Sequence, residues 1–139
     1  SRVICEYLDS LHDGARMFPG AGPARWTALR RQAEADGIMD AAVLARYETF
    51  VRPQEHRWGE WLEGQRQKFR RALDALEVEA GDFGNTVDIG TITIGCALGY
   101  LDFRYGTEDW RATRPKLAAW FAWFGKRPSM ARTAPAEIR

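Results

Sequence analysis

Two histidines and a pair of aspartates are the first residues of this 139-residue sequence whose side chains suit proton transfer or metal binding. His12 lies in a segment rich in glycine and proline, and His56 lies near the start of a predicted helix. Neither has the H-x-x-x-H or Cys/His spacing that a zinc site shows. Asp36 and Asp40 are spaced i, i+4 on a predicted helix, but no other ligand accompanies them. We therefore assign no catalytic residue and no metal site to this sequence.

Thiol chemistry is limited to two cysteines, Cys5 and Cys96, which are far apart in the sequence. Both have mainly apolar neighbours, where a thiol usually serves as inert packing. A small secreted domain usually carries several paired cysteines. Two distant thiols therefore favour a reducing, cytoplasmic compartment.

The charge balance argues against a nucleic-acid or membrane partner. Twenty Lys and Arg against 19 Asp and Glu leave a formal net charge of +1, so we expect no broad basic surface. The basic residues in 66–71 alternate with Gln65, Gln67 and Phe69, which is typical of a solvated helix face. The longest apolar run, residues 89–101, is too short to cross a bilayer. We expect a soluble protein.

Apolar residues recur every three or four positions along most of the chain, which is the period of the α-helix. The sequence predicts helices at 1–11, 23–51, 54–80, 88–104 and 114–125, followed by a short final turn from Pro128. Residues 12–22 are rich in glycine and proline and form a linker between the first two helices. The predicted fold is all-α, a helical bundle with one additional helix in front of it.

The helix at 23–51 has two apolar faces. One is a stripe that runs from Trp26 to Leu44, and the other contains Met39, Val43 and Tyr47. A helix with apolar residues on two sides packs against more than one neighbour, so we expect both faces to be buried.

The stretch 86–104, TVDIGTITIGCALGYLDFR, is strand-like in composition but helix-like in length. Its isoleucines suit a buried strand, whereas Gly95 and Gly99 weaken any strand. We predict that residues 88–104 form the central buried helix, with Asp88 as its N-cap and with glycines that let neighbouring helices approach closely. Thr91 stands where a capping box usually has an acid, so we expect its reciprocal bond to be weak.

These segments, in this order and spacing, resemble the soluble glutathione S-transferases of bacteria. The resemblance covers residues 23–135 and rests on DGIMDA at 36–41, TVDIGTI at 86–92, GCALGYLDFR at 95–104 and RPSM at 127–130. It implies a transferase C-terminal-type helical domain at 23–139 with the helix at 88–104 in its core. Residues 1–11 resemble the last helix of the family's thioredoxin-like domain, which implies a truncated chain that lacks most of that domain.

The resemblance implies an enzyme that conjugates the thiolate of its co-substrate, glutathione, to an electrophilic small molecule. It also implies a homodimer. The activating Ser, Cys or Tyr of the family lies in the thioredoxin-like domain and has no counterpart here. We therefore expect this chain alone to be inactive and to supply part of the electrophile pocket and of the dimer surface.

Other functions stay open on the sequence alone. A noncatalytic helical module that binds apolar ligands or a protein partner is the main alternative, and an unrelated four-helix protein would show a different helix order. Within the family, isomerisation and peroxide reduction are alternatives to conjugation.

The resemblance also implies a role for Ser1. In the family, a serine at the start of this helix binds the γ-glutamyl end of glutathione, and a helix N-terminus offers free N–H groups to a carboxylate. The competing interpretation, which we favour for this chain without the rest of the pocket, is that Ser1 merely caps its helix.

Candidates for the electrophile pocket follow from the same resemblance, because the middle of the long helix faces the active cleft in the family. They are Met39, Val43, Arg46 and Tyr47, with Trp110 as a possible roof. Ordinary burial against another domain or subunit is an equally good interpretation for the helix residues, and loop packing is the alternative for Trp110.

Overall fold

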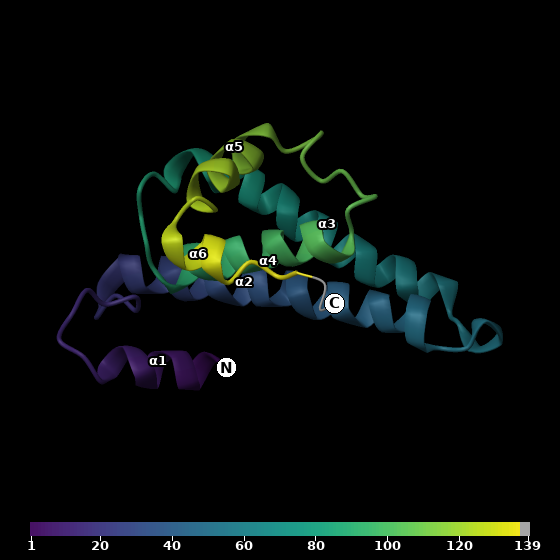
Figure 1. Ribbon diagram of the computed structural model, residues 1–139, viewed down its shortest axis with the longest axis horizontal. Helices are drawn as coiled ribbons and strands as arrows, with labels where there is room; N and C mark the ends of the chain where they lie inside the picture. Colours follow the sequence, from purple (N-terminus) through teal and green to yellow (C-terminus); the bar gives the residue numbers. More distant parts are fainter. Residues whose placement is uncertain (137–139) are drawn as a thin grey trace.

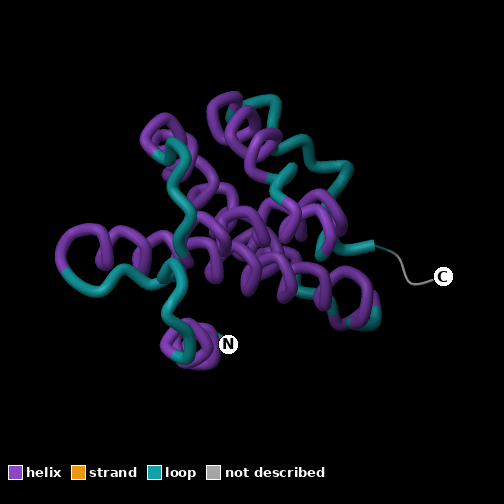
Figure 2. The backbone as a smooth tube through the Cα atoms, turned by 60° about the vertical axis from the view of Figure 1, so that its left-hand side comes forward, coloured by secondary structure: helices purple, strands orange, loops and turns teal. Residues whose placement is uncertain are grey.

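The computed structural model describes residues 1–136, and every regular element within them is a helix. Within that range no strand is present, which confirms the predicted all-α class (Figures 1 and 2). The last three residues of the predicted C-terminal domain lie outside the described residues. The helices are α1 (Arg2–Ser10), α2 (Gly22–Arg46), α3 (Gly59–Glu79), α4 (Ile89–Arg104), α5 (Pro115–Phe124) and α6 (Pro128–Arg132). A π-helical turn, Tyr47–Val51, extends α2, and short 3₁₀ turns at Gln54–His56 and Ala80–Asp82 flank α3.

Helix α2 is the platform of the bundle, because it packs against both α4 and α3. Helix α5 lies over α3 and α4, and α6 follows it back across α4 (Figure 1). Helix α1 lies at the edge of the bundle, beyond the linker loop (Figures 1 and 2), and ion pairs of Arg2 with Asp36 and of Glu6 with Arg25 join it to α2. The bundle with one helix in front of it is therefore the arrangement that the sequence predicted.

Helix α4 is the central buried helix, as predicted for residues 88–104. Most of its residues belong to the core, and Ile94, Ala97 and Leu98 have no exposed surface. Burial is not complete around the helix, because Cys96 is exposed. The apolar composition predicted an axis shielded on all sides, whereas one edge of α4 is open.

A complete capping box begins α4. The Asp88 carboxylate accepts a hydrogen bond from the Thr91 backbone N–H at 2.9 Å, and the Thr91 hydroxyl accepts one from the Asp88 N–H at 3.0 Å. The prediction of a weak reciprocal bond was therefore wrong. The threonine side chain is shorter than that of an acid. Its hydroxyl group also donates a hydrogen bond to the Asp88 carbonyl at 3.1 Å, and this second bond holds it close to the backbone of the cap residue.

The buried face of α2 is not the one that its large apolar residues predicted. Trp26 is 69% exposed and Leu44 is 41% exposed, so the expected Trp26-to-Leu44 stripe does not enter the core. The buried face consists mainly of small residues: Ala28, Ala35, Ile38, Ala41, Ala42 and Ala45. Alanine has a small apolar side chain, so the period of the large apolar residues identifies the opposite face of α2. Small side chains are nevertheless what two closely packed helices require.

Helices α2 and α4 approach each other closely at Gly90. A Cβ atom on Gly90 would lie 2.7 Å from the Ala28 carbonyl oxygen and 2.8 Å from the Cβ of Arg31. Both of these atoms belong to or adjoin the α2 backbone, so neither can swing aside. Glycine at position 90 therefore sets the distance between the two helices.

The linker also fixes the beginning of α4. The Ile89 N–H, which has no partner inside its own helix, donates to the Met17 carbonyl at 2.8 Å. The Met17 N–H in turn donates to the buried Asp9 carboxylate at 2.8 Å. The hydrogen bonds that the Asp9 carboxylate accepts from the Met17 and Phe18 N–H groups lower the pKa of Asp9. One short chain of hydrogen bonds thus connects α1, the linker and α4.

Replacing the N-cap should destabilise the fold. For Asp88→Ala we expect the free energy of unfolding to fall by about 1 kcal/mol, because the first turn of α4 loses its side-chain acceptor. Chemical denaturation measures the change, with Asp82→Ala as a control at an exposed aspartate. Equal denaturation midpoints for Asp88→Ala and the parent chain would show that the Asp88 cap does not stabilise the fold.

Adding one methyl group at Gly90 should destabilise the fold more than loss of the cap. We expect Gly90→Ala to lower the free energy of unfolding by about 1–3 kcal/mol through overpacking against Ala28. The control is Gly64→Ala on α3, where nothing lies within 4 Å of the added Cβ. There alanine should stabilise by up to about 1 kcal/mol through its helix propensity. If both variants were stabilised, the helices would not be in contact at Gly90.

Candidate functional site

The beginning of α1 and the middle of α2 enclose a shallow space, which we call the Ser1 hollow. It has a volume of about 470 Å³ and is lined by Ser1, Arg2, Val3, Ile4, Asp36 and Asp40. Arg2 Nε pairs with Asp36 Oδ2 at 2.6 Å. The Ser1 side chain makes no capping bond, so the interpretation of Ser1 as a simple N-cap does not describe its hydroxyl. That hydroxyl is available to a ligand in the hollow.

A second space, the Met39 cavity, lies between α2, the open edge of α4 and the C-terminal segment. Its volume is about 280 Å³. The lining residues are mostly small or apolar: Met39, Gly95, Cys96, Gly99, Tyr100, Phe121, Gly125, Met130, Ala131, Thr133, Ala134 and Pro135. None of these side chains carries a formal charge at neutral pH. Such a cavity suits an uncharged, largely apolar molecule.

The glycines of α4 differ in what they do for this cavity. A Cβ on Gly95 would lie 2.9 Å from the Met130 Cε and 3.1 Å from the Phe124 ring, so Gly95 permits close packing, as predicted. At Gly99 the nearest atom would be 3.9 Å away, on the Phe121 ring. Gly99 therefore leaves open space that a side chain would fill, and the prediction of close helix packing does not hold there.

Cys96 is the residue of this cavity that sequence reasoning dismissed. It was expected to be inert filler inside the core helix, but it is exposed and lines the cavity. Desolvation by the surrounding protein raises the pKa of the Cys96 thiol, and the charge of Asp36 adds to this effect. Asp36 also lines the Ser1 hollow, so the two spaces are electrostatic neighbours. The spacing of Cys96 between Gly95 and Gly99 was the one signal of an open helix edge.

The other predicted residues of α2 lie further toward its C-terminal end. Val43, Arg46 and Tyr47 do not line the Met39 cavity. The Arg46 guanidinium lies over the Phe50 ring, 4.4 Å from its centroid, and Tyr47 is 59% exposed. Of these four candidates, three on α2 and Tyr47 in the π-helical turn after it, Met39 is the one that lines the cavity described above.

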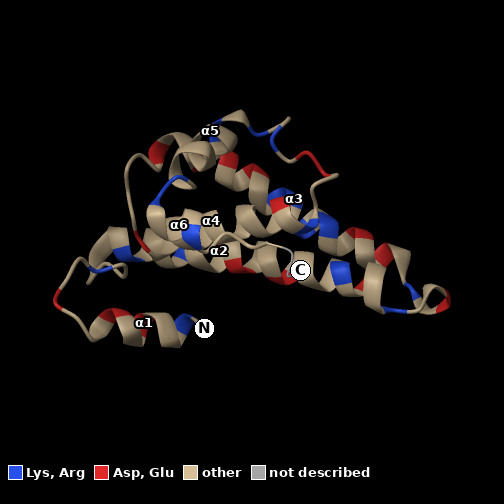
Figure 3. Ribbon diagram, viewed as in Figure 1, with Lys and Arg blue, Asp and Glu red and all other residues tan. Residues whose placement is uncertain are grey.

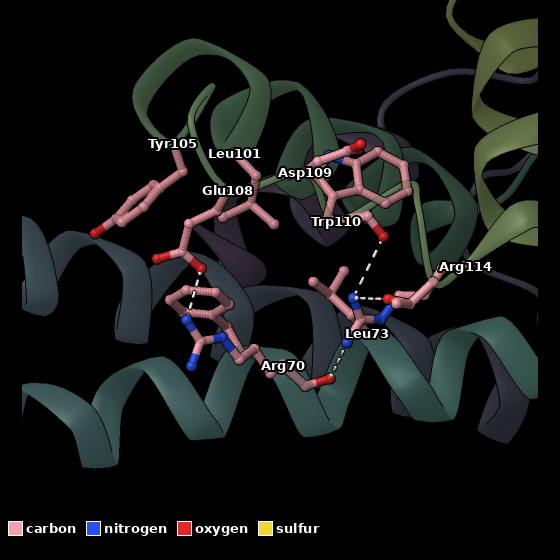
Figure 4. A pocket seen from close by; sticks show the side chains of 10 residues that line it. Arg70, Leu73, Leu101, Tyr105, Glu108, Asp109, Trp110 and Arg114 are labelled. Carbon is pink, nitrogen blue, oxygen red and sulfur yellow. Dashed lines mark hydrogen bonds and ion pairs between the residues drawn. The ribbon is translucent and has the colours of Figure 1, made fainter.

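Trp110 lies in a different place from Met39. It is 6% exposed, and its indole Nε1 donates to Asp102 Oδ1 at 2.9 Å. The Arg111 guanidinium covers its ring at 4.4 Å. Trp110 lines a separate cavity between α3 and the segment after α4, so it does not form a common pocket with Met39 (Figure 4).

Charge is distributed without a dominant patch. Acidic and basic side chains alternate along α2 and α3 (Figure 3). Within residues 1–136, no group of three or more His, Cys, Asp or Glu side chains is placed to hold a metal ion. In the same range, none of the helices has the length and apolar character needed to cross a membrane.

The described residues thus form an all-α bundle with an apolar cavity at the open edge of its central helix. The family model for "Glutathione S-transferase, C-terminal domain" matches residues 59–122. The GST-like protein YibF of Escherichia coli K12, which carries the description uncharacterized, is 37% identical over 139 residues, covering 97% of this chain and 68% of YibF. The chain belongs to the glutathione S-transferase family.

Solved structures give the same assignment. A glutathione transferase family member from Pseudomonas fluorescens Pf-5, with bound S-(propanoic acid)-glutathione, matches at a TM-score of 0.94 and 50% identity, over 98% of this chain and 70% of that one. A glutathione S-transferase from Methylobacillus flagellatus KT, with glutathione bound, matches at a TM-score of 0.91 and 35% identity, over 97% of this chain and 68% of that one. The resemblance seen in the sequence is therefore confirmed.

The raised pKa of Cys96 predicts slow thiol chemistry near neutral pH. Because less thiolate is present at a given pH, we expect iodoacetamide to modify Cys96 more slowly than a free cysteine, with a pH midpoint above that of the free thiol. Mass spectrometry of the labelled peptide measures the rate at each pH. Cys96→Ala identifies labelling at Cys5, and a midpoint at or below that of the free thiol would contradict the expected environment.

Proposed function

We propose that this chain is the C-terminal part of a cytoplasmic, homodimeric glutathione transferase that conjugates the thiolate of glutathione to an apolar electrophile. The Met39 cavity holds the electrophile, and Ser1 helps to bind the γ-glutamyl end of glutathione. The observation that carries the proposal is the position of the apolar Met39 cavity beside the Ser1 hollow in a member of this family. Relatives with bound glutathione or its S-conjugate support the choice of co-substrate.

The chemistry assigns different tasks to the two spaces. Glutathione carries charged ends, and a helix N-terminus such as that of α1 provides N–H groups for a carboxylate. An electrophile with an apolar body gains binding free energy from the Met39 cavity, where Gly99 leaves room and Phe121 provides an aromatic wall. Holding both reactants close together lowers the entropic part of the barrier to thiolate attack.

Exposed apolar residues support a further domain and a second subunit. Helix α1 exposes Val3, Tyr7 and Leu11 at 81%, 62% and 61%, although such residues usually pack against other apolar groups. In the proposal this face covers the sheet of a preceding thioredoxin-like domain. A second set of exposed residues, Phe50, Val51 and Trp58, lies where α2 turns into α3 and contributes to the dimer surface.

Conjugation of a chlorodinitrobenzene-type electrophile tests the proposal. We expect no activity above the uncatalysed rate from this chain alone, because no residue in it activates the thiol. Joined to a thioredoxin-like domain of the family, the chain should become active. Measurable conjugation by this chain alone would contradict the assignment of thiol activation to the other domain.

Within the active two-domain protein, Gly99→Leu tests the Met39 cavity. The new side chain should fill the space, so KM for the electrophile should rise about tenfold, equivalent to ~1.4 kcal/mol of lost binding. KM for glutathione should stay unchanged. Gly64→Leu on α3 is the control, since it lies on the exposed face of another helix. Equal kinetics for both variants would place the electrophile elsewhere.

A further inference from the structure

A cavity without an assigned role lies beside the C-terminal end of α4 (Figure 4). It has a volume of about 320 Å³ and is formed by α3, the end of α4 and the segment 105–114. We call it the Arg70 cavity. It shares no lining residue with the Met39 cavity, so a ligand in one does not occupy the other.

The inner walls of the Arg70 cavity are apolar and aromatic. Phe69, Leu73 and Leu101 are at most 2% exposed, and Trp110 is 6% exposed. The Phe69 and Tyr105 rings pack together with centroids 5.6 Å apart. The volume is at the lower end of the range for small-molecule sites and accommodates one or two fused aromatic rings. These walls select the flat, apolar part of a ligand.

A buried cation forms part of the same cavity. The Arg114 residue is 8% exposed, and its terminal nitrogens donate to the Trp110 carbonyl at 3.3 Å and the Arg70 carbonyl at 3.3 Å. It also pairs with Asp74 at 2.6 Å, but the Asp74 side chain is 65% exposed and therefore well solvated. Arg114 Nε has no hydrogen-bond partner among the described residues. The wall therefore holds a guanidinium group that pairs with Asp74 and leaves its Nε without a partner among the described residues.

At the more exposed side of the cavity, a carboxylate of the chain already sits against two arginines. Arg70 Nη2 pairs with Glu108 Oε2 at 3.0 Å, while Arg66 Nε lies 3.6 Å from Glu108 Oε1, beyond hydrogen-bond distance. Arg66 Nε is also buried, and within residues 1–136 it has no hydrogen-bond partner. The Arg70 and Glu108 side chains are 43% and 28% exposed. A pair as exposed as this contributes little free energy, so another carboxylate can displace Glu108.

The charges decide the class of ligand. Two arginines, Arg70 and Arg114, and two carboxylates, those of Glu108 and Asp109, line the cavity. A cation would meet both guanidinium groups, and a neutral molecule would make no use of their N–H groups. A planar carboxylate matches the fork of a guanidinium group and can accept two parallel hydrogen bonds. We propose that the Arg70 cavity binds a small aromatic carboxylate, with its ring against Phe69 and Trp110 and its carboxylate on Arg70 in place of that of Glu108.

This assignment makes Glu108 an internal competitor of the ligand. The bound state requires Glu108 to leave Arg70, so neutralising Glu108 should increase the affinity. Neutralising Arg70 should decrease it, because the ligand carboxylate loses its partner. The opposite signs of these two effects distinguish a carboxylate site from an apolar cavity that merely accepts aromatic rings.

Isothermal titration of the chain with 2-naphthoate tests the proposal, with 2-naphthamide and 2-naphthylmethylamine as neutral and cationic counterparts. We expect 2-naphthoate to bind at least about tenfold more tightly than either, a difference of ~1.4 kcal/mol. Glu108→Gln should tighten naphthoate binding about tenfold, and Arg70→Gln should weaken it by a similar factor. Arg71→Gln is the matched control, since Arg71 is an exposed neighbour on α3 that does not line the cavity.

Magnetisation transfer between the bound naphthoate ring and the Trp110 indole provides a measurement on the unaltered chain. The expected result is a set of nuclear Overhauser contacts to Trp110 and none to Met39. The proposal is overturned by absence of naphthoate binding at millimolar concentration, by equal affinity for the three probes, by equal effects of Arg70→Gln and Arg71→Gln, or by contacts to Met39 alone.

Discussion

The fold depends on how closely α4 can approach α2. At Gly90 the space available is smaller than a methyl group, since an added Cβ would come within 2.7 Å of the Ala28 carbonyl oxygen. Alanines along the buried face of α2 continue this close contact, and α4 fills it with residues such as Ala97 that have no exposed surface. Dispersion contacts at this separation are numerous, and each is lost if the helices move apart. Helix α3 packs against α2, and α5 packs against α3 and α4, so the other helices of the bundle lie around this pair.

The beginning of α4 is fixed as firmly as its packing. The capping box satisfies the backbone groups of Asp88 and Thr91, and Ile89 donates to the linker carbonyl of Met17. Since the linker is held in turn by Asp9 on α1, the helix that carries Ser1 is connected to the helix that carries Cys96. The distance between the Ser1 hollow and the Met39 cavity is therefore a property of the helix framework.

Much of the fold could be predicted from the sequence, because the period of the apolar residues identifies helices directly. Asp88 was recognised as the N-cap, and the length of the 88–104 segment outweighed its strand-like composition. The buried side of α2 could not be predicted in the same way. Large exposed residues such as Trp26 gave the stronger periodic signal, whereas the true contact face is made of alanines. An amphipathic pattern identifies the helix face with the large apolar side chains, and on α2 that face is exposed.

The candidate site was less predictable, because it is defined by the space that side chains leave. Met39 was named from the family resemblance, but Gly99 and Cys96 contribute through an open edge that composition alone does not reveal. Trp110 was placed near Met39 because it follows α4 in the sequence, yet the bond from its indole to Asp102 places it in the other cavity. The chain therefore presents two cavities of different chemistry around the same central helix, one without charged side chains and one lined by both arginines and carboxylates.

The central claim about function is that the apolar substituent of a glutathione conjugate occupies the Met39 cavity. Nuclear Overhauser contacts in the two-domain protein with bound S-hexylglutathione test it most directly. The account predicts contacts from the hexyl chain to the methyl groups of Met39 and Met130. Contacts confined to Trp110 and Leu73, with none to either methionine, would contradict it.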